Sequence, residues 1–173
     1  CDYDSVELMC KNGHYVINKL ESLGVNFTKF KDGSIYQRRY GGQTLNFSQG
    51  DLAHRACCIA DKTGYEIHSN LYKACLNNKN TFFDYCFILD LLFEDNKCYG
   101  AIALDLNCGK ISIFHAKSIV IASGGYNQIY QHNTSIANFS GDLVSAIIQN
   151  NLPVQDMEFV QFHPTCLHNS NIL

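Results

Sequence analysis

The chain has 173 residues, of which 46% are hydrophobic, and its 13 basic and 16 acidic residues give a net charge of −3. A chain of this length can bury the core of an ordinary domain, whereas the lack of clustered lysine and arginine argues against nucleic acid as a partner. No apolar run approaches the roughly 20 residues that cross a bilayer, so we expect no membrane span in this chain.

The nine cysteines of the chain are odd in number and show no C-x-x-C spacing. An odd set without a signal peptide favours reduced thiols over a disulfide framework. We therefore expect buried, reduced cysteines and no metal site.

The first part of the chain begins with a helical pattern. Apolar residues between Ser5 and Leu23 recur on one helical face, and Gly24 supplies a stop signal. The pair Asp32-Gly33 then suits a tight turn, which predicts a hairpin between residues 25–30 and 34–40.

The next segment is rich in glycine and polar residues from Gly41 to Gly50, which predicts a loop. A short strand is expected at 54–59. After Thr63-Gly64, apolar residues spaced by three to four positions predict a second helix that ends near Asn77.

The second half begins with three strand-like runs, which predict an antiparallel meander at 81–93, 99–106 and 110–116. The apolar run 118–122 then predicts a strand covered on both faces. A helix is expected at 141–150, followed by an extended segment from 154 to 163.

The small residues Ser123, Gly124 and Gly125 follow the predicted strand 118–122. Glycine has no β-carbon, so a cofactor could lie against bare backbone here, although a Gly-Gly pair after a strand is more often an ordinary turn.

Three further side chains have both a structural and a functional interpretation. Asp142, at the start of a predicted helix, could cap it or bind a ligand. His163 precedes a proline that could direct its imidazole towards a carboxylate, or it could be structural. Tyr40 could form the wall of a substrate pocket or simply pack.

From Gly33 onward the sequence resembles the flavoprotein subunits of succinate dehydrogenases. Four segments carry the resemblance: DGSIYQRRYGGQTLNF at 32–47, AHRACCIADKTG at 53–64, SIVIASGGYNQIYQ at 118–131, and VQDMEFVQFHPT at 154–165. Together they extend over most of the chain.

The resemblance implies FAD as cofactor and assigns roles to matching positions. His163 of the His-Pro-Thr motif should bind a substrate carboxylate, and Tyr40 replaces a phenylalanine that lines the dicarboxylate pocket. The residues expected to contact FAD are Ala122, Ser123, Gly124, Gly125, Thr134 and Asp142.

Several positions depart from the family pattern. Asn127 and Gln128 stand where glycine and arginine are usual, and Leu143 replaces the second glycine of Gly-Asp-Gly. The upstream G-x-G-x-x-G turn, the flavin-linked histidine and the downstream proton-transferring arginine are not among these residues. We therefore expect this chain alone to be inactive, with no catalytic residue of its own.

The fold implied by the resemblance is α/β, part of a Rossmann-like FAD-binding domain with an antiparallel β-meander. Residues 1–156 are assigned to the partial FAD-binding domain and 157–173 to the start of the substrate-capping domain. The implied reaction is oxidation of succinate to fumarate, with fumarate reductase or L-aspartate oxidase as alternatives.

The implied partners are the remainder of the flavoprotein subunit, an iron–sulfur subunit that passes electrons towards quinone, and membrane-anchor subunits. The location would be the matrix side of the mitochondrial inner membrane or the cytoplasmic face of a bacterial membrane. Cys1 replaces an initiator methionine and 169–173 carry no capping signal, so both ends look cut. The alternative is a split or non-catalytic structural subunit.

Overall fold

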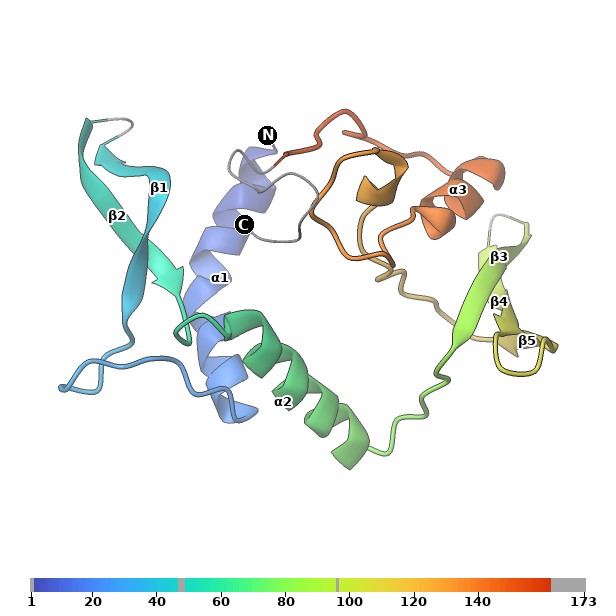
Figure 1. Ribbon diagram of the computed structural model, residues 1–173, viewed down its shortest axis with the longest axis horizontal. Helices are drawn as coiled ribbons and strands as arrows, with labels where there is room; N and C mark the ends of the chain where they lie inside the picture. Colours follow the sequence, from blue (N-terminus) through green and yellow to red (C-terminus); the bar gives the residue numbers. More distant parts are fainter. Residues whose placement is uncertain (1, 47–48, 96, 163–173) are drawn as a thin grey trace. The chain divides into compact units, whose positions relative to one another are not determined.

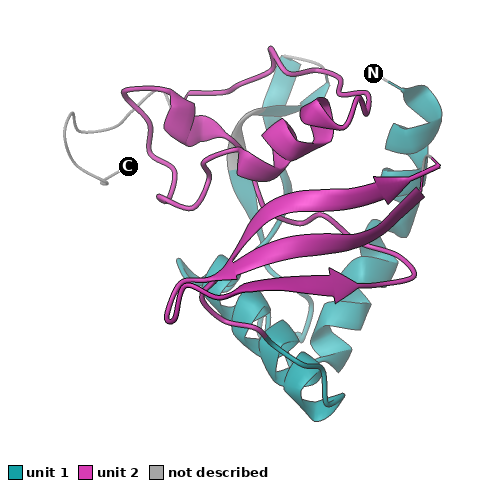
Figure 2. Ribbon diagram, turned by 90° about the vertical axis from the view of Figure 1, so that its right-hand side faces the viewer, with its two compact units in different colours: residues 1–82 teal, residues 83–173 magenta. Residues whose placement is uncertain are grey.

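The structure, a computed structural model, describes residues 2–46, 49–95 and 97–162. It divides into two compact units, residues 1–82 and residues 83–173 (Figures 1 and 2). Each unit combines helix with an antiparallel sheet. The mixed helix and sheet composition predicted from the sequence is confirmed.

Unit 1 begins with the long helix α1, Tyr3–Ser22, which confirms the first predicted helix (Figure 1). Asp2 caps it, because Oδ1 accepts hydrogen bonds from the backbone N–H groups of Asp4 at 3.1 Å and Ser5 at 3.3 Å. Gly24 follows the helix with a φ of +96°, which confirms the predicted stop.

The sheet of unit 1 pairs β1, Gln37–Asn46, with β2, Gln49–Cys57, in antiparallel order. The predicted hairpin around Asp32-Gly33 is reduced to a single bridge between Lys29 and Ile35. The predicted loop at 41–50 is also wrong, since 41–46 and 49–50 are strand. The register shifts between Arg39 and Thr44, and such irregularities let a glycine-rich strand stay paired.

The second helix of unit 1 is α2, Thr63–Asn77, as the sequence predicts. The backbone N–H of Thr28 donates to the carbonyl of Cys58 at 2.9 Å, so the stretch after α1 pairs with the chain beyond β2. The buried apolar residues of this unit are Val25, Phe27, Ala53 and Cys58.

Unit 2 contains the predicted meander, with β3 at Cys86–Glu94, β4 at Lys97–Asp105 and β5 at Ile111–His115 (Figure 2). The strands run antiparallel in the order β3-β4-β5. The short 3-10 helix η1, Asn127–Ile129, and the helix α3, Asp142–Gln149, follow. The side chain of Asn150, directly after α3, donates a hydrogen bond to the carboxylate of Asp90 on β3. The buried apolar side chains in the described part of this unit are those of Leu91, Ala103 and Ala146.

The strand predicted at 118–122 is absent from the described structure, where these residues have no regular secondary structure. Val120 is 88% exposed, so the expected burial on both faces is also wrong. A strand needs hydrogen-bonded neighbours, and the strands of the described part of unit 2 pair only within the meander. The apolar run is therefore left unpaired.

The described cysteines are all free, and only Cys58 is buried, so the expected burial of the thiols is wrong at the other described positions. Within residues 2–46, 49–95 and 97–162, no helix combines the length and apolar character that crossing a membrane requires.

Candidate functional site

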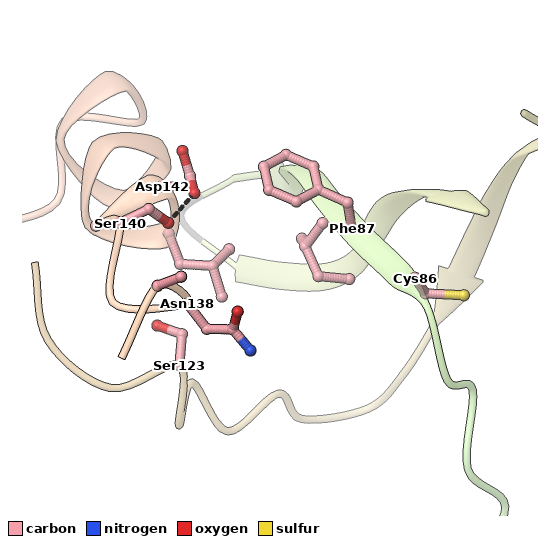
Figure 3. A pocket seen from close by; sticks show the side chains of 10 residues that line it. Cys86, Phe87, Ser123, Asn138, Ser140 and Asp142 are labelled. Carbon is pink, nitrogen blue, oxygen red and sulfur yellow. Dashed lines mark hydrogen bonds between the residues drawn. The ribbon is translucent and has the colours of Figure 1, made fainter. Parts of the chain in front are cut away.

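A pocket of about 390 Å³ lies in unit 2, where the start of β3, Ser123, the loop 137–141 and the start of α3 meet (Figure 3). Its volume is at the lower end of the range for small-molecule sites. The lining residues are Cys86, Phe87, Ile88, Ser123, Ala137, Asn138, Ser140, Gly141, Asp142 and Leu143.

Asp142 occupies the first turn of α3, where the positive end of the helix dipole favours a carboxylate. Gly141 precedes it with a φ of +82°, which a residue with a side chain rarely adopts. The hydroxyl of Ser140 donates to Oδ2 of Asp142, as Figure 3 shows. A carboxylate offers about four acceptor positions, so Asp142 keeps acceptor capacity for a ligand.

The glycines after Ser123 are close to neighbouring side chains. Gly124 has a φ of +78°, and a β-carbon there would lie 2.5 Å from Cε1 of Phe139. A β-carbon on Gly125 would lie 2.8 Å from Oδ1 of Asn127. The absence of a β-carbon at Gly124 and Gly125 therefore leaves room for the side chains of Phe139 and Asn127. Ser123 is the residue of this stretch that lines the pocket.

The loop that carries Thr134 is organised by Gln128, whose role sequence reasoning missed. Its Nε2 donates to Oδ1 of Asn133 at 3.1 Å and to the carbonyl oxygens of Ser135 at 2.9 Å and Ile136 at 3.1 Å. Gln128 is one of the positions that depart from the pattern of the resembling family, and the two N–H groups of its amide are shared among these three acceptors. The departure from the family pattern marked Gln128 as unusual. The sequence does not show which oxygen atoms accept hydrogen bonds from its amide.

The structure brings together only two of the predicted FAD contacts, Ser123 and Asp142, as lining residues of one pocket. Ala122 and Thr134 are exposed and do not line it. Asn138 and Ser140 line the same pocket but were not predicted, because their positions depend on how the loop before α3 folds.

The two residues predicted to bind substrate are Tyr40 and His163. Tyr40 belongs to β1 in unit 1, and His163 lies outside the described residues. Their roles in substrate binding stay predictions.

The chemistry of the pocket fits the polyol part of a cofactor. The hydroxyls of Ser123 and Ser140 and the amide of Asn138 can donate or accept hydrogen bonds, and Asp142 accepts them from hydroxyl groups. Phe87 and Leu143 add apolar surface. The pocket does not suit a pyrophosphate, because its described lining contains a carboxylate and neither lysine nor arginine.

Comparison with known proteins decides the family. The family model described as FAD binding domain matches residues 1–173. The chain belongs to this FAD-binding domain family. FAD is accordingly the cofactor of the domain, which confirms the cofactor expected from the sequence.

The relatives of this FAD-binding domain include the succinate dehydrogenase flavoprotein subunit of Rickettsia conorii, 43% identical over 99% of this chain and 29% of the relative. A mitochondrial succinate dehydrogenase flavoprotein of Xenopus laevis is 41% identical over 99% of this chain and 26% of the relative. The resemblance stated from the sequence is confirmed. The chain spans less than a third of the length of these relatives.

The fold of the FAD-binding domain is also found in a solved structure, a variant of Escherichia coli quinol fumarate reductase. The TM-score is 0.91 at 32% identity, over 100% of this chain and 28% of that chain. This match confirms the fold of mixed helices and antiparallel sheets described above.

Proposed function

We propose that this chain is part of the FAD-bearing subunit of a succinate dehydrogenase, which oxidises succinate to fumarate. The observation that carries the proposal is the 43% identity to the Rickettsia conorii flavoprotein subunit across 99% of the chain. The pocket at Ser123 and Asp142 supports it, because its donor and acceptor groups suit the hydroxyls of a flavin side chain.

The chain's own residues would hold the cofactor rather than react. Asp142 would accept a hydrogen bond from a cofactor hydroxyl, and Ser123 would donate or accept one beside it. We assign further contacts to Ala122, Gly124, Gly125 and Thr134 on the matching family motif. When bound, FAD supplies the acceptor for the hydride that leaves succinate.

His163 and Tyr40 are the residues of this chain that we propose to contact the substrate. The imidazole of His163 would donate a hydrogen bond to one carboxylate of succinate, which fixes the orientation of the substrate. Tyr40 would line the dicarboxylate pocket. We place the boundary between the FAD-binding domain and the substrate-capping domain near Asp156, with 157–173 opening the second.

The proposed assembly contains the remainder of the flavoprotein subunit, an iron–sulfur subunit and membrane anchors. Val120 is 88% exposed, which supports the presence of further chain, because covering an exposed apolar side chain stabilises a folded protein. The proposed location is the matrix side of the mitochondrial inner membrane or the cytoplasmic face of a bacterial membrane, consistent with mitochondrial and bacterial relatives.

The experiment that tests the cofactor role compares Asp142→Ala with Asp142→Asn in the full-length subunit, assembled with limiting FAD. Losing a hydrogen bond to a charged acceptor should lower FAD affinity about tenfold or more, whereas asparagine keeps an acceptor oxygen and should cost less. Glu158→Ala is the control, because Glu158 is exposed and lies outside the pocket. Equal flavin content in all three variants would contradict the assignment of Asp142.

A second candidate function is fumarate reduction, favoured by the TM-score of 0.91 with Escherichia coli quinol fumarate reductase. Both reactions use the same dicarboxylate pocket, and their direction depends on the redox potential of the flavin and its electron partners. The ratio of succinate oxidation to fumarate reduction in the native complex, measured with electron acceptors and donors of known potential, separates the two.

A further inference from the structure

Tyr126 connects two parts of unit 2. One is the cofactor side, which is the part that lines the pocket at Ser123 and Asp142, and the other is the segment that precedes His163 in the sequence. Its hydroxyl donates to the backbone carbonyl of Met157 at 2.5 Å, and the two residues are 31 positions apart in the sequence. The bond is partly buried. It is therefore a tertiary contact between the chain just after Ser123-Gly124-Gly125 and residues 157–162.

The body of the Tyr126 side chain also lies against the start of α3. A β-carbon on Gly141 would be 2.7 Å from Cβ of Tyr126, so the two backbones approach closely. Gly141 precedes Asp142, which lines the pocket. Tyr126 thus contacts the cofactor side through its Cβ and Met157 through its hydroxyl.

A second contact links the same two segments. The rings of Tyr130 and Phe162 meet edge to face, with centroids 5.1 Å apart and an interplanar angle of 79°. Tyr126 and Tyr130 flank η1, which fixes their spacing. Phe162 is the residue directly before His163 in the sequence.

We propose that Tyr126 and Tyr130 form a two-point clamp that positions the substrate-binding segment relative to the flavin side of the site. The inference rests on the proposed function, because it takes His163 to be the carboxylate ligand. The two tyrosines are positioning residues. By holding residues 157–162 before substrate arrives, they reduce the conformational entropy lost when His163 binds a carboxylate.

The test compares Tyr126→Phe with Tyr130→Phe in the full-length subunit within its native complex. Both variants lose only a hydroxyl, but the structure gives Tyr126 a hydrogen bond there and gives the Tyr130 hydroxyl no hydrogen-bond partner among the described residues. The readouts are the dissociation constant of malonate, a dicarboxylate too short to be dehydrogenated, followed by flavin absorbance, and the hydrogen exchange of residues 157–162.

Tyr126→Phe should raise the malonate dissociation constant and the KM for succinate about two- to tenfold, the effect of one net hydrogen bond, and should speed exchange at 157–162. Flavin content and kcat should change less, which a general loss of structure would not produce. Tyr130→Phe should match the wild type, whereas Tyr130→Leu should resemble Tyr126→Phe because the ring contact is lost.

Wild-type dicarboxylate affinity and exchange in Tyr126→Phe would overturn the clamp while leaving the proposed function intact. A wild-type complex that binds no dicarboxylate would overturn both. If Tyr126→Phe fails to assemble, Phe162→Leu removes the other contact, and an unchanged malonate dissociation constant in that variant would likewise overturn the inference.

Discussion

The Nδ2 of Asn150 donates to Oδ1 of Asp90 at 3.1 Å, which joins the residue after α3 to the middle of β3. The same Oδ1 accepts from the backbone N–H of Leu91 at 2.8 Å, and Nδ2 of Asn150 also donates to the carbonyl of Ala146 at 2.9 Å. This network holds the helix that begins with Asp142 against the meander.

Asp90→Ala should therefore loosen α3. Removing a partly buried acceptor leaves the Asn150 amide without this partner, and we expect local opening of α3 to become easier by about 1–2 kcal/mol. Hydrogen exchange of the α3 amides measures this free energy. Asp84→Ala is the control, because Asp84 is exposed and accepts no hydrogen bond within the described residues. Equal exchange in the two variants would contradict the role of Asp90.

Gly124→Ala should destabilise unit 2 more than Gly109→Ala. Both glycines have positive φ, so alanine costs about 1–2 kcal/mol in backbone strain at either position. At Gly109 a β-carbon meets nothing within 4 Å, whereas at Gly124 it would lie 2.5 Å from Phe139. Overpacking should add about 1–3 kcal/mol at Gly124.

Thermal unfolding of the two variants in the full-length subunit measures the difference. Equal Tm values would show that Phe139 moves aside at little cost. A lower Tm for Gly109→Ala than for Gly124→Ala would contradict the steric argument outright.

Gln128→Leu should release the loop that carries Thr134. The variant loses the amide donors to Asn133, Ser135 and Ile136, and we expect the loop to open more easily by about 1–2 kcal/mol. Hydrogen exchange between residues 129 and 139 measures the change. Gln128→Arg keeps several donors and should retain most of the protection.

Gln155→Leu is the control for Gln128→Leu, since Gln155 is exposed and has no hydrogen bond within the described chain. If Gln128→Leu and Gln155→Leu exchange alike over this loop, the hydrogen bonds of Gln128 do not organise it.

Asp105 should make the turn between β4 and β5 sensitive to acid. The backbone N–H of Asn107 donates to its carboxylate at 2.8 Å and, together with the Cys108 thiol, lowers the pKa of Asp105 below its ordinary value. A lowered folded-state pKa contributes stability above the unfolded pKa of 3.8, and that stability is lost as the pH falls through the folded value.

Asp105→Asn should remove this part of the pH dependence while keeping an acceptor oxygen for Asn107. Thermal unfolding of both proteins at neutral pH and through the acidic range below pH 4 measures it. Parallel Tm curves for the wild type and Asp105→Asn would contradict the assignment.

Local patterns predicted much of this fold. The helices α1, α2 and α3 and the meander were predicted because helical periodicity and turn residues act over a few positions. The segments 41–46 and 118–122 were predicted wrongly, because strand formation depends on a distant partner that local pattern does not reveal.

Only part of the candidate site was predicted, because the rest depends on contacts between distant parts of the chain. The family motif identified Ser123 and Asp142, which the structure brings to one pocket. Asn138, Gln128 and Tyr126 were missed, because an amide or a phenol in a loop has no distinctive pattern until the loop's tertiary contacts are known.

We propose that the protein containing this sequence holds FAD and removes hydride from succinate. The most direct measurement is the visible absorbance of the native, full-length protein in its complex during anaerobic titration with succinate. We expect a flavin spectrum that bleaches on addition of succinate and returns on addition of fumarate. A native protein without flavin absorbance, or a flavin that neither dicarboxylate affects, would contradict it.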